Sequence, residues 1–438
     1  MEKTTKNMGL WSAISKGVGG MIGAGIFSIM GIACQIAGNA VYLSFILAGI
    51  VALFCTYSYG KLGETYPSSG GPVEFLIKGF GTGITSGGFN LLLWIGYVFA
   101  LALYAKAFAS YAVTFLPAQY GGIWVNILAT ASIVLFTAVN FIGAKAVGRS
   151  EIVIVIIKVV ILLAFAGLGF AFMDPSRLAV AKWPTTGNIL FGAGVVFIGF
   201  EGFGLITNAA GDMEDPRRTL PMALYLSVLI VTGVYVAVSM VVVGNLDIPE
   251  IIKSREFALA QAAKPFLGVI GFKIMAIAAL FSTSSAINAT LYGGANVSYM
   301  VAREGELPEM FDRKVWGRAI EGLFITAAVV IFVTNTMNLE GIAMMGSALF
   351  LVIYTAVNIG HLRLCTATGA NRAMIWVSIV SCVAALITLG YYIIQSSPTT
   401  LMALLIAIIL CFAFEWAYRR ISGRTLSQST SPHSRQVR

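Results

Sequence analysis

Twelve long apolar runs, joined by short polar segments, constrain this 438-residue chain more than any other feature. A helix that crosses a bilayer needs about 20 mostly apolar residues. The composition agrees, since 58% of the residues are hydrophobic and only 11% are charged. The runs predict spanning helices at residues 9–34, 39–63, 84–114, 123–143, 151–173, 188–210, 220–244, 270–301, 321–336, 340–361, 374–394 and 399–418. We therefore expect an all-α integral membrane protein with twelve transmembrane helices and no separate soluble domain.

The formal charge of +9 arises from basic residues whose distribution indicates how the chain is oriented in the membrane. With the N-terminus inside, Lys and Arg gather in the segments that face the cytoplasm, as the positive-inside rule requires. Both termini are then cytoplasmic, in a multi-pass protein of the inner or plasma membrane. Anionic lipid headgroups are the expected contact for the basic residues, and nucleic acid is not. No segment indicates an obligate protein partner.

Lys158 stands in the middle of the apolar run at residues 151–172. A charge at the centre of a span costs at least about 2.5 kcal/mol, and such a residue is a functional-site hypothesis by default. Apolar neighbours on both sides keep the side chain from reaching either surface. Either a polar cavity surrounds the ammonium group or the side chain loses its proton. Both alternatives indicate transport.

Glycines cluster in the first span, GVGGMIGAGIF (17–27), and again in the sixth, FGAGVVFIGFEGFGLITNAAG (191–211). Small residues also mark close helix–helix contacts, which is an alternative interpretation. However, glycine-interrupted spans at positions 1 and 6 are typical of inverted-repeat transporters with a binding site at the midplane. We expect both helices to be broken there. Freed amides would suit a carboxylate and freed carbonyls an ammonium group, which together bind a zwitterion.

Several motifs carry a resemblance to a known family: GGMIGAGIF (19–27), YPSSGGPVEF (66–75), NFIGAKAVGRSE (140–151), GFGLITNAAGDMEDPRRTLP (202–221), AAKPFLG (262–268) and ALFSTSSAINATLYGGANVSYMVAREGELPE (279–309). With these motifs the chain resembles the amino acid–polyamine–organocation (APC) superfamily, and within it the archaeal proton-coupled amino acid transporters.

The resemblance implies the LeuT-type fold and secondary transport of amino acids by alternating access. The fold is a 5+5 inverted repeat with broken helices 1 and 6. Residues 9–173 would form the first repeat and residues 188–361 the second, with helices 11 and 12 at 374–418 outside them. Residues 1–8 and the Ser-rich tail 419–438, which is expected to be disordered, would be the cytoplasmic ends.

The same resemblance assigns residues to the substrate. The amides that hold its carboxylate are those of Gly23, Ala24 and Gly25. The carbonyls that accept from its amine are those of Met21, Ile198 and Glu201. The side chains that contact the substrate side chain or act as a gate are Phe197, Phe200, Glu201 and Phe203. A polar anchor on helix 3 has no clear counterpart, since that neighbourhood holds Tyr104.

In the proton-coupled relatives a helix 5 lysine takes the position of a sodium ion, and Lys158 matches it. The resemblance implies that its ammonium group bonds the Gly19 carbonyl near Ser282 and Ser285. The proton would be the coupling ion, and neither a metal nor a cofactor is expected. The alternative is a permanently charged lysine that only ties helices together.

Two further charges in spans allow more than one interpretation. Glu201 could face the substrate side chain, where it would favour cationic amino acids or titrate with the substrate. Alternatively, it could pair with Lys106 or lie solvated in a vestibule. Lys106 could form an ion pair inside the bundle or provide a second proton site.

The function expected from these features is proton-coupled symport of amino acids of broad specificity. The alternative is an amino acid or polyamine exchanger without net proton flux. The sequence has no GxxxxGK[ST] loop, which argues against ATP-driven transport, and its two histidines form no metal-binding motif. We do not expect an enzyme.

Overall fold

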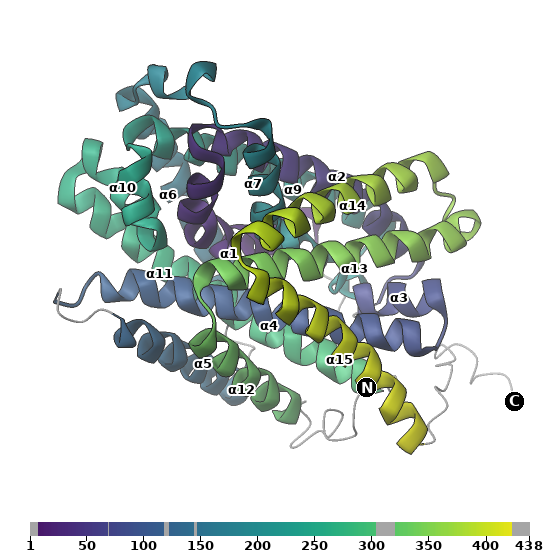
Figure 1. Ribbon diagram of the computed structural model, residues 1–438. Helices are drawn as coiled ribbons and strands as arrows, with labels where there is room; N and C mark the ends of the chain where they lie inside the picture. The colour runs from purple at the N-terminus through teal and green to yellow at the C-terminus, as the bar shows by residue number, and fades with distance from the viewer. Residues whose placement is uncertain (1–7, 69, 118–121, 144–146, 304–319, 423–438) are drawn as a thin grey trace, which may run out of the picture.

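The computed structural model describes residues 8–68, 70–117, 122–143, 147–303 and 320–422. In this part of the chain, helices make up the structure (Figure 1). The long ones are α1 (Leu10–Ala37), α2 (Val41–Thr65), α4 (Ile84–Val113), α5 (Ile123–Gly143), α6 (Val147–Phe172), α7 (Thr186–Val196) with η5 (Phe197–Phe203) and α8 (Gly204–Thr207), α9 (Pro216–Asn245), α11 (Ala258–Arg303), α12 (Ile320–Thr336), α13 (Leu339–Thr368), α14 (Arg372–Ser396) and α15 (Pro398–Ser422). The short ones are η1 (Gly38–Ala40), α3 (Pro72–Phe80), η3 (Pro175–Leu178), η4 (Val180–Lys182), η6 (Ala210–Asp212), α10 (Ile248–Lys253) and η7 (Arg255–Phe257).

Each of the twelve predicted spans coincides with one of the long helical segments. Ten apolar stretches of the described chain are long enough to cross a membrane. One of them, Gly25–Thr65, covers parts of both α1 and α2, and α12 adds a shorter apolar helix, Gly322–Thr336. The chain is therefore a multi-pass membrane protein, as the composition predicts.

The eighth span begins earlier than predicted. Helix α11 starts at Ala258 rather than at residue 270, and a bend at Gly268 divides it into two arms. Gly268 has φ 61°, which glycine adopts without the steric penalty of other residues. Pro265 and Gly268, both unfavourable inside a helix, separate this arm from the longer apolar run that follows it.

Caps fix both ends of α13 and the start of α14. The Asn338 side chain accepts a 2.7 Å hydrogen bond from the Gly341 amide at the start of α13. Helix α13 ends at Gly369, whose left-handed φ of 60° is the usual way to stop a helix. Asn371 then caps α14 by accepting from the Ala373 amide at 2.8 Å. The sequence therefore turns the chain back within a few residues.

The contacts between helices follow a symmetric pattern that relates two sets of five helical segments. The first set is α1, α2, α4, α5 and α6, and the second is α7–η5–α8, α9, α11, α12 and α13. Helix α2 packs on α9, α4 on α11, and α5 on α12, which lie side by side in Figure 1. Crossed contacts also match, since α1 meets α9 as α2 meets α7, and α4 meets α13 as α6 meets α11. Helices α14 and α15 pack outside these sets, against α2, α4, α7 and α13.

The glycines of α1 lie against other helices of the bundle. A Cβ added at Gly202 of η5 would lie 2.5 Å from backbone atoms of Gly20 and Met21. One added at Gly25 would lie 2.9 Å from the Cα of Gly199. Backbone therefore meets backbone where α1 crosses η5, which only residues without a side chain permit.

This contact predicts that Gly202→Ala destabilises the protein. A methyl group at this position overlaps the α1 backbone, and overpacking of this kind costs about 1–3 kcal/mol. The thermal unfolding midpoint of the purified variant should fall and its transport rate should drop. The matched control is Gly233→Ala on α9, where an added Cβ meets nothing within 4 Å. Equal midpoints for the two variants would contradict the close contact.

Candidate functional site

Helix α1 is continuous, which corrects the prediction of a break in the first span. It runs as one α-helix from Leu10 to Ala37 through all five clustered glycines. The amides of Gly23, Ala24 and Gly25 therefore lie inside a helix, where amides bond carbonyls four residues earlier. The side chain of Ala24 lies outside the described residues. The alternative interpretation, a small-residue helix contact, describes this segment in the present conformation.

The sixth span is interrupted, by tightening of the helix rather than by unwinding. Residues Phe197–Phe203 form the 3-10 segment η5 between α7 and α8. Ser347 of α13 bridges its start, because its hydroxyl donates to the Val195 carbonyl at 2.7 Å and accepts from the Ile198 amide at 2.9 Å. A 3-10 stretch inside a longer helix often marks a functional hinge.

Three phenylalanines of η5 face a scaffold of tyrosines. Side chains three residues apart nearly eclipse one another on a 3-10 helix, so Phe197, Phe200 and Phe203 share one side. The ring centroid of Phe197 lies 5.7 Å from that of Tyr354, and that of Phe203 lies 4.9 Å from it. The Phe200 ring lies 5.4 Å from Tyr235. All three phenylalanines are fully buried in this packing.

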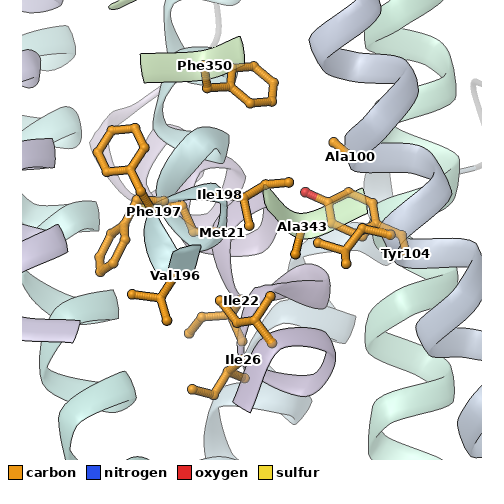
Figure 2. Close-up of a cluster of buried hydrophobic side chains, with 14 of the residues drawn as sticks. Met21, Ile22, Ile26, Ala100, Tyr104, Val196, Phe197, Ile198, Ala343 and Phe350 are labelled. Carbon is orange, nitrogen blue, oxygen red and sulfur yellow. The ribbon is translucent and has the colours of Figure 1, made fainter. Parts of the chain in front are cut away.

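Ile198 and Glu201 are likewise three residues apart, and Glu201 contacts α4. Tyr104 of α4 donates a 2.7 Å hydrogen bond to Oε1 of Glu201. Figure 2 shows Tyr104 and Ile198 in one cluster of buried side chains, together with Ile22 and Ile26 of α1. The side of η5 that carries Ile198 and Glu201 therefore combines an apolar side chain with a carboxyl group.

Glu201 is a buried carboxylate without a cation beside it. Its residue is 2% exposed, and its Oε2 atom has no hydrogen-bond partner within the described chain. No Lys, Arg or His of the described residues lies within 4.0 Å of it. Lys106 instead donates to Oδ1 of Asn126 at 3.3 Å. The interpretations that paired Glu201 with Lys106 or left it solvated are wrong, because α4 and η5 enclose it.

Tyrosine hydroxyls bind two of the three carbonyls assigned to the substrate amine. Tyr235 of α9 lies 2.6 Å from the Met21 carbonyl oxygen and 3.0 Å from that of Gly199. Tyr354 of α13 donates to the Glu201 carbonyl at 3.0 Å. Neither tyrosine is among the residues predicted from the sequence, although a hydroxyl inside an apolar span needs a partner and could have indicated them.

Lys158 of α6 lies where the resemblance predicts. The residue is 1% exposed, and its Nζ donates a 2.8 Å hydrogen bond to the Gly19 carbonyl of α1. Ser282 of α11 donates to the Ile22 carbonyl, three residues further along α1, at a distance of 3.0 Å. Ser285 is partly buried on the same helix. Helices α6 and α11 thus both bond the α1 backbone within one turn of each other.

These features are those of a multi-pass membrane transporter, and comparison with known proteins identifies the family to which the chain belongs. The amino acid permease family matches residues 8–414. An uncharacterised protein of Methanocaldococcus jannaschii is 42% identical over 98% of this chain and 99% of its own length. The inner membrane transport protein YbaT of Escherichia coli is 34% identical over 82% of this chain and 84% of its own. The branched-chain amino acid permease BcaP of Bacillus subtilis is 24% identical over 70% and 69%.

The chain belongs to the amino acid permease family of the APC superfamily. It is a transporter and not an enzyme, and membership of this family supports amino acid transport.

The Tyr235 contacts predict an effect of Tyr235→Phe on stability. The change removes the hydroxyl that connects α9 to α1 and η5, and a buried hydrogen bond contributes about 1 kcal/mol. The unfolding midpoint of the substrate-free protein should fall accordingly. Tyr391→Phe is the control, because the Tyr391 side chain is exposed and no hydrogen bond to its hydroxyl is described. An unchanged midpoint for Tyr235→Phe would mean that the hydroxyl contributes nothing to holding α1.

Proposed function

We propose that this protein is a proton-coupled amino acid symporter that works by alternating access. The observation that carries the proposal is the hydrogen bond from the buried Lys158 ammonium group to Gly19 of α1. This bond places the ammonium group of an α6 side chain against α1. Helix α1 also carries the amides predicted to bind the substrate carboxylate. A change in the protonation of this one group would therefore act directly on α1.

The matched contacts of the two helix sets support the LeuT-type inverted repeat. Each set holds five spans, and an odd number of crossings puts the second set in the membrane upside down relative to the first. The pairs α2–α9, α4–α11 and α5–α12 then relate equivalent helices across the repeat axis. Such repeats transport by rocking one group of helices against the other around a central site.

Proton coupling requires that the two conformations hold the Lys158 proton with different affinity. In the present conformation the ammonium group has a carbonyl acceptor and is almost fully buried. Movement of α1 away from α6 would remove this acceptor and weaken the stabilisation of the buried charge. Burial penalises a charge that has lost a hydrogen-bond acceptor, so that conformation would hold the proton less tightly.

Substrate binding in this account requires α1 to open locally. The amides of Gly23, Ala24 and Gly25 would leave their helical bonds and bind the substrate carboxylate. The substrate ammonium group would replace the Tyr235 hydroxyl at the Met21 carbonyl and bind the Ile198 and Glu201 carbonyls. Each exchange substitutes one hydrogen bond for another, which keeps its free energy small.

Glu201 gives the site a preference within a broad substrate range. Its Oε2 is buried without a partner, on the side of η5 that contacts α4. A substrate side chain that carries an ammonium or guanidinium group would neutralise this carboxylate. We place the side-chain subsite at Glu201 and Ile198. Phe197, Phe200 and Phe203 would move with η5 as a gate, through their contacts with the tyrosines.

The distribution of Lys and Arg supports a location in the cell membrane with both termini in the cytoplasm. The described part of the chain offers no group of three or more His, Cys, Asp or Glu residues arranged for a metal ion. In this account the proton is the coupling ion and needs no cofactor.

Lys158→Ala tests the coupling. Wild-type protein in proteoliposomes should accumulate labelled alanine against its gradient when a pH gradient is imposed. The variant should lose this accumulation while its unfolding curve still shows a folded protein. Lys182→Ala is the control, since Lys182 is an exposed lysine of the η4 segment. Uphill uptake by Lys158→Ala at the wild-type rate would contradict the proposal, and wild-type exchange without any response to pH would favour the exchanger.

Glu201→Gln tests the substrate preference. The amide keeps the shape and can still accept from Tyr104, but it lacks the charge. A hydrogen bond to a charged group contributes about 1.5–3 kcal/mol, so the KM for lysine should rise tenfold or more. The KM for alanine should change little. Glu64→Gln, which removes a surface ion pair with Lys61, is the matched control. An unchanged lysine-to-alanine preference would remove Glu201 from the subsite.

A further inference from the structure

A cavity lies away from the central site. It has a volume of about 400 Å³ and lies between α1, α4, α5, η7 and the start of α13. Ile32, Lys106 and Asn126 line it from α1, α4 and α5, and Glu256 and Glu340 line it from η7 and α13. Several of its lining residues lie in or beside segments that the sequence assigns to the outer side of the membrane. A volume of this size accommodates a small ligand.

Two cations and two carboxylates line the cavity without pairing. They are Lys106, Arg255, Glu256 and Glu340. Among the described residues, none of the four lies within 4.0 Å of an opposite charge. Opposite charges that share one small cavity usually form direct ion pairs. Here the separation leaves groups of both signs available to a ligand.

Neutral side chains hold the charged groups in place. Lys106 donates to Oδ1 of Asn126 at 3.3 Å, and Ser110 donates to Oε2 of Glu256 at 3.4 Å. Tyr392 donates to Oε1 of Glu340 at 3.1 Å. Each of these bonds uses only part of the hydrogen-bonding capacity of the charged group. Further donors on Lys106 and further lone pairs on the carboxylates are left for a ligand.

We propose that this cavity binds a zwitterionic α-amino acid on its way to the central site. Its carboxylate binds Lys106 and Arg255, and its ammonium group binds Glu256 and Glu340. The arrangement suits a molecule that carries an ammonium group and a carboxylate on the same carbon and has no net charge. A simple anion or cation carries only one of these groups. The proposal rests on the proposed amino acid transport.

The cavity is close enough to the central site to supply it. Lys106 follows Tyr104, the partner of Glu201, by two residues on α4. Ile32 follows Gly25 by seven residues on α1, which is about 10 Å along a helix. Beside the cavity η7 packs directly on α1, where a Cβ at Gly31 would overlap the backbone of Arg255.

Because the proposed site lies on one face of the carrier, its loss should change the KM only for substrate that enters from that face. Lys106→Gln and Glu256→Gln should each raise the KM for alanine by about tenfold when the substrate enters from the η7 face. The KM for substrate entering from the opposite face should stay at the wild-type value, which also reports an intact fold. Lys253→Gln is the control, because Lys253 is exposed on α10 and does not line the cavity.

The measurement is initial-rate uptake of labelled alanine in right-side-out and inverted vesicles. KM changes confined to the η7 face support the proposal. Unchanged KM from both faces, equal changes from both faces, or a change in maximal rate alone would overturn it. A change in maximal rate alone would mean that these charged groups affect the conformational change of the carrier and not substrate binding.

Failure of the proposed function has a different signature. Wild-type vesicles would then take up neither alanine nor lysine from either face. In that case equilibrium dialysis of the purified protein with labelled alanine decides the inference. Binding that Lys106→Gln and Glu256→Gln each abolish would support the cavity site, and binding that both variants retain, or no binding at all, would overturn it.

Discussion

The structure depends on keeping one ammonium group in the membrane interior. Lys158 is buried in an apolar span, where an unsatisfied charge is costly, and the Gly19 carbonyl of α1 compensates it. This contact requires α1 to lie close to α6, while η5 must approach α1 from another side. The glycines of α1 and η5, such as Gly20 and Gly202, allow that approach. The buried charge and the glycines thus depend on the same position of α1.

The present conformation satisfies the groups that a substrate would use. Tyr235 and Tyr354 bond the Met21 and Glu201 carbonyls, and α1 keeps its amides in helical bonds. A carrier that left these groups unpaired in the membrane would be unstable when empty. Replacing internal bonds by equivalent bonds to the substrate changes the free energy little, which is what rapid interconversion between two states needs.

The sequence predicted much of the fold, because apolar length decides where a chain can cross a bilayer. The Lys158–Gly19 contact followed from the resemblance. The continuity of α1 did not follow, since glycine runs suit both a helix break and a close helix contact, and only the neighbouring helices decide between them. The Tyr104–Glu201 contact was also missed, because it joins α4 to η5 across nearly a hundred residues. Pairings of this kind depend on packing that no local pattern encodes.

The central claim is that the proton moves with the amino acid through Lys158. Proteoliposomes with a trapped pH-sensitive dye and no imposed gradient test it most directly, when labelled alanine is added outside. The account predicts that the lumen acidifies in step with alanine uptake, and that Lys158→Ala abolishes the acidification. Alanine uptake by the wild-type protein without any acidification would contradict it.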